Sequence, residues 1–307
     1  MSNLGHAGFL TQCAEGRSGR PTFRAATIAS VPVVFINGLG ETTDFWDPVC
    51  ARLPDVDVVR FDRPAPAGLG NHLDAQVDEL HSMITSHAYP PAEGADVLLV
   101  GHSFGGLLAE AYARAHPRRV AGLVLVDPTL AEDYADPDAA DRRAPAAGGA
   151  FGRLASRTLR SGRIRPALSW LLPRLMLGLG TSGDSVRHQL AQLPADLGWK
   201  LTAPSHLART EFDNRRLSGY CAELLAARAA TGPVTLPVTV LVGGRGPRVW
   251  HNQQRAWIAG QRAQLPRISS DACMHVLDGA HLLMLDAPTA VADAIRAVAG
   301  ACLRPQK

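Results

Sequence analysis

Short apolar runs alternate with segments of helical spacing over the first part of the chain. Four runs rich in Val, Ile, Leu and Phe have the length and composition of strands in a buried sheet. They span residues 31–36, 56–61, 96–100 and 120–126. Residues 74–87 carry apolar side chains at helical spacing, and residues 107–116 are rich in Ala, Leu, Glu and Arg and end before a proline. This alternation predicts right-handed crossovers and a mostly parallel sheet flanked by helices.

The alternation stops at about Thr129. From there to Thr231 the sequence has no strand signal, and it shows a linker rich in Ala, Asp, Pro and Gly followed by helical segments. The strand and helix patterns then resume, at about residues 237–242, 249–264, 272–277 and 288–302. We therefore predict that residues 1–129 and 232–307 form one α/β core, and that residues 130–231 form an inserted helical cap.

Composition and charge narrow the class of protein. The 307 residues are 46% hydrophobic and 19% charged, as in an ordinary globular protein, and the net charge of +3 with scattered basic residues argues against nucleic-acid binding. The five cysteines are widely spaced and form no Cys-x-x-Cys pair, which favours reduced thiols and a cytoplasmic protein. The N-terminal sequence lacks the pattern of a signal peptide, and no apolar segment is long enough to span a bilayer, so we expect no integral membrane segment.

The motif Gly101-His102-Ser103-Phe104-Gly105 lies between an apolar run and a helical segment. A serine flanked by glycines at a sharp turn from strand to helix is typical of a nucleophile elbow, because the serine is strained and side chains at the glycine positions would clash. The free N–H groups at the start of the helix then point at the reacting centre. The motif therefore predicts Ser103 as a nucleophile, supported by Gly101 and Gly105.

Together these features resemble the α/β-hydrolase family with a helical cap. Two further stretches carry the resemblance, which covers about two thirds of the chain. Asn37-Gly38-Leu39-Gly40, after the first predicted strand, is similar to the family's oxyanion loop, and residues 277–288, after the last predicted strand, are similar to its histidine loop. The resemblance implies that His281 is the catalytic base that activates Ser103.

The resemblance also implies an oxyanion hole built from the backbone N–H groups of Leu39 and Phe104. The family's oxyanion loop usually begins with His, whereas this one begins with Asn37. Because backbone groups form the hole, the substitution need not abolish it. Asn37 and Gly38 take supporting positions, and Asn37 either holds the loop or serves only a local turn.

The triad acid departs further from the family pattern. The family commonly places it after the strand that corresponds to residues 238–242, but the loop there reads Gly243-Gly244-Arg245-Gly246-Pro247, with Gly246 where the Asp is expected. The family's other position is the end of the strand after the elbow helix, which carries Asp127. Asp127 keeps the chain order Ser, Asp, His, so we predict it as the acid. The alternatives near the histidine in sequence are Asp278 and Asp286.

The implied chemistry is acyl transfer from a small to medium, largely apolar ester, thioester or lactone to Ser103 and then to water. The apolar segment that includes Trp170 and Met176 is the candidate wall of the substrate pocket, unless its side chains only pack the cap on the core. The expected partner is a small-molecule acyl substrate, and no metal or other cofactor is implied. The alternative is a hydrolase-like protein that binds a ligand or catalyses a non-hydrolytic acyl transfer, lyase or cyclase reaction in the same pocket.

Overall fold

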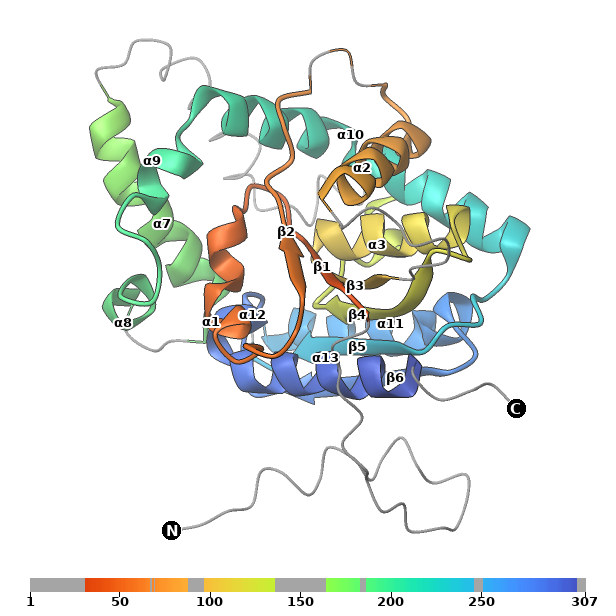
Figure 1. The fold of residues 1–307 in the computed structure, drawn as a ribbon. Helices are drawn as coiled ribbons and strands as arrows, with labels where there is room; N and C mark the ends of the chain where they lie inside the picture. Colours follow the sequence, from red (N-terminus) through yellow and green to blue (C-terminus); the bar gives the residue numbers. More distant parts are fainter. Residues whose placement is uncertain are drawn as a thin grey trace, which may run out of the picture.

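The computed structural model describes residues 31–66, 68, 70–87, 97–135, 164–182, 186–245 and 251–302. Within these ranges, six strands form one parallel sheet (Figure 1). In spatial order they are β2 (Val58–Arg60), β1 (Val33–Ile36), β3 (Val97–His102), β4 (Val120–Val126), β5 (Val238–Gly243) and β6 (Ala272–Leu277). The strand order reverses at β1, which pairs with β2 on one side and β3 on the other. The carboxyl ends of β1 and β3 therefore flank the kind of crevice in which α/β sheets bind ligands.

Both faces of the sheet are covered by helices. The helices are α1 (Asp47–Cys50), α2 (Leu73–His87), α3 (Phe104–Ala115), α11 (His251–Ile268) and α13 (Pro288–Cys302). Val34 and Ile36 of β1 belong to an apolar cluster that includes residues of α2, α3 and α11, whereas Val33 and Phe35 belong to a second cluster with residues of α1 and α13. Burial on both faces explains why the strands are continuous apolar runs. The predicted mostly parallel sheet flanked by helices is confirmed.

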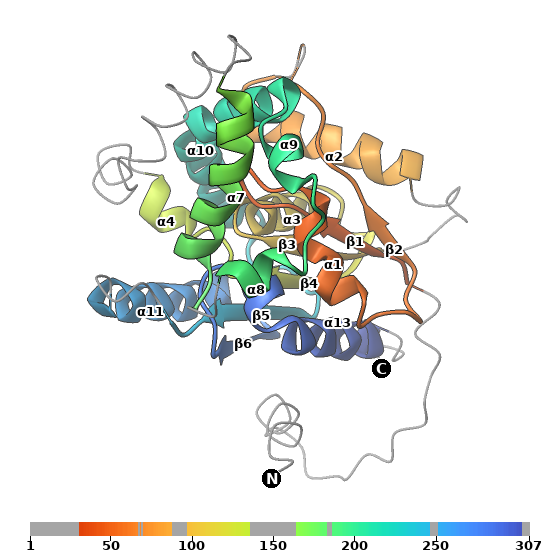
Figure 2. The ribbon, with the colours of Figure 1, turned by 90° about the vertical axis from the view of Figure 1, so that its left-hand side faces the viewer.

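Helices also form the connection between β4 and β5, as far as the structure describes it. They are α4 (Ala131–Tyr134), α7 (Arg165–Gly180), α8 (Val186–Leu190), α9 (Leu197–Leu201) and α10 (Pro204–Thr231). α7 packs against α8 and α9, and these three helices lie to one side of the sheet (Figures 1 and 2). α10 runs back over α2 and α3, and its Tyr220 and Leu224 belong to the core cluster. The assignment of residues 130–231 as a cap stays a prediction.

α7 continues through Pro173, although a proline has no N–H to donate to the carbonyl of Ser169 four residues earlier. The backbone of α9 approaches that carbonyl so closely that a Cβ at Gly198 would lie 1.8 Å from Ser169 O. Only a residue without a side chain fits at this contact. α7 and α9 are therefore fixed to each other at the level of their backbones.

The state of the cysteines and the length of the helices can be compared with the expected reduced thiols and the expected lack of a membrane segment. The four cysteines within the described ranges are free thiols. Burial raises the pKa of the Cys221 thiol to about 12, so this residue is an inert core side chain. None of the helices in the described part of the chain is long and apolar enough to cross a membrane. The cytoplasmic location stays a prediction.

The first turn of α3 contacts the end of β1 with no room for a side chain, since a Cβ at Gly105 would lie 2.2 Å from Ile36 O. Gly105→Ala is therefore expected to destabilise the fold by about 1–3 kcal/mol or more, the usual cost of overpacking a core. The matched control is Gly219→Ala in α10, where no atom lies within 4 Å of the added Cβ and alanine is the better helix former. Thermal melts followed by circular dichroism measure both effects. A Gly105→Ala protein that melts at or above the wild-type temperature would contradict the packing.

Candidate active site

Ser103 lies on the sharp turn between β3 and α3, with a backbone φ of 51°. Such a conformation costs about 1–3 kcal/mol for a residue with a side chain. The surrounding backbone holds it, because Ser103 N–H donates to Val126 O at 3.0 Å and Ser103 O accepts from Thr129 N–H at 3.1 Å. The flanking glycines make the turn possible, since a Cβ at Gly101 would lie 2.3 Å from Gly105 O. This strained turn has the shape expected of a nucleophile elbow, and the role of Ser103 as nucleophile stays a prediction.

The carboxylate of Asp127 meets the ring of His281. Asp127 follows β4 directly with a φ of 40°, and its Oδ2 lies 2.6 Å from His281 Nδ1. Its other oxygen, Oδ1, accepts hydrogen bonds from Gly243 N–H and Trp257 Nε1–H, both at 3.1 Å. Three donors thus fix the buried carboxylate in one orientation. The contact holds the proton of a neutral His281 on Nδ1 and leaves Nε2 as an acceptor.

The charge environment of His281 favours the imidazolium. Burial by the surrounding protein opposes the charge, but the hydrogen bond to Asp127 and the negative charges of Asp127 and Glu41 outweigh it and raise the pKa of His281 above its ordinary value. The side chain keeps 44% of its surface exposed, which limits the opposing effect of burial. His281 is therefore suited to accept a proton from a neighbouring group.

Ser103 and His281 lie at the same edge of the sheet, but no hydrogen bond joins Ser103 Oγ to His281 Nε2 in the described part of the structure. Of the three expected triad members, Asp127 and His281 are therefore in contact, and Ser103 lies at the same edge of the sheet without a hydrogen bond to His281. Hydrogen bonds between a nucleophile and its base are often long in enzymes without substrate and shorten in the substrate complex.

The side chain of Asn37 holds the loop that follows β1. Asn37 Oδ1 accepts from Trp46 Nε1–H at 3.0 Å, and Asn37 Nδ2–H donates to Asp62 Oδ1 at 2.9 Å. Asp62 Oδ1 also accepts from Thr43 N–H at 2.8 Å. Asn37 therefore ties the ends of β1 and β2 to the segment that begins at Thr43. These contacts are those of a side chain that holds the loop, and the supporting role of Asn37 in the site stays a prediction.

A buried carboxylate, Glu41, joins three loops of the site. Its Oε2 accepts from Gly38 N–H at 2.8 Å, and its Oε1 lies 2.7 Å from Nδ1 of the fully buried His102. Nε2 of His102 lies 2.9 Å from His281 O and must donate to it, because a carbonyl can only accept. The oxyanion loop, the elbow and the histidine loop are thus linked through one pair of side chains.

The backbone donors expected to form the oxyanion hole follow from these contacts. Gly38 N–H is occupied by Glu41, so the next donor along the loop is that of Leu39. Phe104 is the first residue of α3, and its N–H has no partner within the helix. The positive end of the α3 dipole adds to the attraction for an anion there. The assignment of Leu39 and Phe104 as oxyanion donors stays a prediction.

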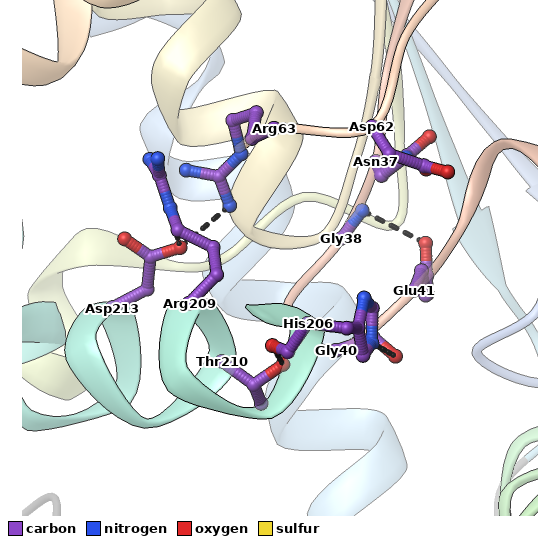
Figure 3. A pocket seen from close by; sticks show the side chains of 10 residues that line it. All are labelled: Asn37, Gly38, Gly40, Glu41, Asp62, Arg63, His206, Arg209, Thr210 and Asp213. Atoms are coloured by element: carbon purple, nitrogen blue, oxygen red, sulfur yellow. Dashed lines mark hydrogen bonds and ion pairs between the residues drawn. The ribbon is translucent and has the colours of Figure 1, made fainter. Parts of the chain in front are cut away.

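A small polar pocket lies between the oxyanion loop and α10 (Figure 3). Its lining residues are Asn37, Gly38, Gly40, Glu41, Asp62, Arg63, His206, Arg209, Thr210 and Asp213. Nε2 of His206 lies 3.1 Å from Gly40 O and donates to it, while Arg63 and Arg209 both pair with the buried Asp213 at 2.8 Å. The cavity measures about 20 Å³, which is room for about one water molecule. The lining side chains hold the oxyanion loop in place, and the cavity itself is too small for an acyl chain.

The two residues expected to wall an apolar substrate pocket lie elsewhere, and their role stays a prediction. Neither Trp170 nor Met176 lines the cavity beside the oxyanion loop. Trp170 is 60% exposed, and the guanidinium of Arg174 lies over its ring. Met176 packs against the second core cluster. α7 thus turns one of its apolar sides to the core and another to solvent.

The alternatives for the acid have other partners. Asp278 is exposed and pairs with Arg245. Asp286 Oδ2 accepts from the N–H groups of Ala280 and Ser182, each at 2.8 Å, and so holds the histidine loop to the end of α7. Asp127 is therefore the carboxylate at His281 Nδ1 among the described residues, and Gly246 lies outside them. No group of three or more His, Cys, Asp or Glu side chains in these ranges is arranged to hold a metal ion.

Comparison with known proteins agrees with this geometry. A model of the alpha/beta hydrolase family matches residues 33–294, which include most of both predicted core segments and the connection between them. The chain belongs to the alpha/beta hydrolase family. The match includes the elbow, the oxyanion loop and the histidine loop.

Curated relatives of this family match over part of the chain. The lipase LipV of Mycobacterium tuberculosis is 34% identical over 110 residues, which are 33% of this chain and 38% of the lipase. The 1-acylglycerol-3-phosphate O-acyltransferase ABHD5 of Sus scrofa is 31% identical over 122 residues, or 38% of this chain and 34% of the relative. The matched segments thus span about a third of the length of these relatives.

Solved structures of family members share the fold. A thermophilic esterase from Thermogutta terrifontis superposes with a TM-score of 0.58 and 19% identity, covering 90% of this chain and 92% of the esterase. ALR0039, an alpha/beta hydrolase from Nostoc sp PCC 7120, superposes with a TM-score of 0.63 at the same identity and covers 87% and 90%. At this identity the likeness concerns the fold alone.

Sequence reasoning gave no role to three residues that shape the site here. They are Glu41, His102 and Trp257. Glu41 stands three residues after Gly38 in a turn, a spacing that allows a carboxylate to accept a backbone N–H, and this was a usable signal. The contacts of Trp257 and His102 depend on segments far apart in the chain, and no local pattern indicates them.

We expect Asp127→Asn to lower the pKa of His281, because the amide removes the charge that stabilises the imidazolium. Glu41→Gln should lower it by less, since Glu41 acts on His281 through its charge alone. The control is Asp278→Asn, whose carboxylate is exposed and paired with Arg245. NMR titration of the His281 ring measures all three. An unchanged pKa in Asp127→Asn would show that the carboxylate does not control the imidazole.

Proposed function

We propose that this member of the alpha/beta hydrolase family is a serine hydrolase that cleaves small to medium, largely apolar esters, thioesters or lactones through an acyl-serine intermediate. The observation that carries the proposal is the contact between Asp127 Oδ2 and His281 Nδ1 at 2.6 Å, beside a serine held at a positive φ. The relatives named as lipases support an acyl substrate.

The mechanism follows from the protons that this arrangement controls. His281 Nε2 accepts the Ser103 proton while Ser103 Oγ attacks the carbonyl carbon of the substrate, and Asp127 stabilises the imidazolium. The N–H groups of Leu39 and Phe104 donate to the oxyanion of the tetrahedral intermediate. Its collapse breaks the bond to the leaving group, which takes the proton from His281. Water then attacks the acyl-serine with His281 as base, and the acid is released.

The second candidate is acyl transfer to an alcohol in place of water. One specific observation favours it, which is the likeness to a relative named as an acyltransferase. The same serine, base and oxyanion donors serve both reactions, and the difference lies in which acceptor reaches the acyl-serine. Product analysis with an added long-chain alcohol separates them: a free acid as the main product supports hydrolysis, and an ester of the added alcohol supports transfer.

Ser103→Ala is expected to abolish labelling by a fluorophosphonate probe and to lower kcat for a chromogenic ester on the order of a thousandfold or more. The fold should be unchanged, because alanine tolerates the same backbone about as well as serine. Ser169→Ala is the matched control, since its hydroxyl only bonds Pro166 O within α7. Mass spectrometry of the labelled peptide and steady-state kinetics measure the two effects. Labelling that survives in Ser103→Ala would overturn the nucleophile assignment.

A further inference from the structure

α7 carries apolar side chains on the side that faces solvent. Leu171, Leu175 and Leu179 are spaced four residues apart and so lie along one side of the helix, with Trp170 beside them. Trp199 of the adjoining α9 is also exposed. Each of these five side chains keeps between 40 and 60% of its surface exposed. We call them the α7 face, and α7 lies on the side of the molecule turned toward the viewer in Figure 2.

This face is additional to the side by which α7 packs on the protein. Pro173, Leu177 and Gly180 of α7 are buried, and Leu177 belongs to the second core cluster. A helix that needs only to cover a core has one apolar side and one polar side, whereas α7 is apolar on both. Large exposed apolar patches rimmed by polar groups mark interaction sites.

Arginines and tryptophans are paired on the α7 face. The guanidinium of Arg174 lies 4.1 Å from the centre of the Trp170 ring, and that of Arg165 lies 5.0 Å from the centre of the Trp199 ring. A tryptophan ring with an arginine at its face suits the boundary between lipid headgroups and acyl chains, where the ring sits at headgroup level and the arginine reaches the phosphates.

The charge of the sequence points to the same occupant. Residues 142–183, which include all of α7, contain eight arginines and neither Asp nor Glu. The rest of the chain, with 23 basic and 28 acidic residues, is net negative. Two of the eight, Arg165 and Arg174, lie in the described part of the chain, each against an exposed tryptophan. Basic residues next to exposed Leu and Trp are the pattern of a helix that lies in the interface of an anionic membrane.

We propose that the α7 face docks this protein on the surface of an anionic phospholipid membrane, with the helix lying along the interface. Docking would bring the candidate site to the lipid, because the end of α7 is bonded to the histidine loop. Leu282 N–H donates to Gly180 O at 2.7 Å, and Ser182 N–H donates to Asp286 Oδ2 at 2.8 Å. The docking surface is independent of the proposed chemistry at Ser103.

The test is co-sedimentation of the full chain with vesicles of phosphatidylcholine alone or mixed with phosphatidylglycerol. We expect binding to the mixed vesicles, much weaker binding to phosphatidylcholine alone, and release by high salt. Leu175→Ser combined with Leu179→Ser should weaken binding by about tenfold or more, because two apolar side chains no longer enter the interface. Arg174→Gln should weaken binding to the mixed vesicles only.

The matched control is Val276→Ser, which removes an exposed apolar side chain from β6 and should bind as the wild type does. Ser103→Ala should also bind as the wild type does, so failure of docking and failure of the proposed hydrolysis give different results. Wild-type protein that binds neither kind of vesicle would overturn the proposal, as would a double serine variant that binds normally. A wild-type dimer that the double variant converts to a monomer, without vesicle binding, would assign the face to a second copy instead.

Discussion

The hydrogen bond between Asp127 and His281 requires the loops after three neighbouring strands to converge on one point. Asp127 ends β4, Gly243 ends β5 and donates to the same carboxylate, and His281 follows β6. The loop after β5 lies directly on the histidine loop, with Gly244 N–H donating to Leu277 O at 2.7 Å and Arg245 N–H to Gly279 O at 2.8 Å. A Cβ at Gly243 would lie 2.6 Å from Ala280 O. This close approach leaves room for backbone only at Gly243, and the carboxylate that meets His281 comes from the end of the neighbouring β4.

The oxyanion loop depends on buried polar contacts from two directions. Glu41 holds Gly38 from the side of the elbow through its contact with His102, and His206 of α10 holds Gly40 from the other side. Removing charged groups from water is costly unless each finds a partner, so such pairs contribute more to one defined geometry than to stability. Burial lowers the pKa of His206, which keeps that side chain neutral in its supporting position. The loop is thus held before any substrate arrives.

The bounds of an element could be predicted from the sequence where the element is buried on both faces or begins at a clear start signal. β4 and β6 begin and end at the expected residues, and so does α13, because a strand buried on both faces is a continuous apolar run and a helix that starts at a proline has a clear first residue. The contact of Asp127 with His281 was also accessible, because the resemblance to the family implies the end of the strand after the elbow helix as the other position of the acid. The link between Glu41 and His102 was not, because it joins side chains from loops that only the folded sheet brings together.

The sequence says less about α7. An apolar helix pattern indicates that a side chain avoids water but not what covers it. Trp170 is 60% exposed in the structure, and its assignment to the substrate pocket stays a prediction.

The junction of α7 with the histidine loop limits what docking can do. Docking on a membrane can change the chemistry of the site only if the site has two conformations and the membrane binds the protein more tightly in one of them. The backbone contact of Leu282 with Gly180 is close, and a Cβ at Gly180 would lie 2.6 Å from the Leu282 side chain, so this junction has little freedom to take a second arrangement. Docking through the α7 face would therefore act on the local concentration and orientation of a lipid substrate, and leave the turnover of a water-soluble ester at Ser103 unchanged.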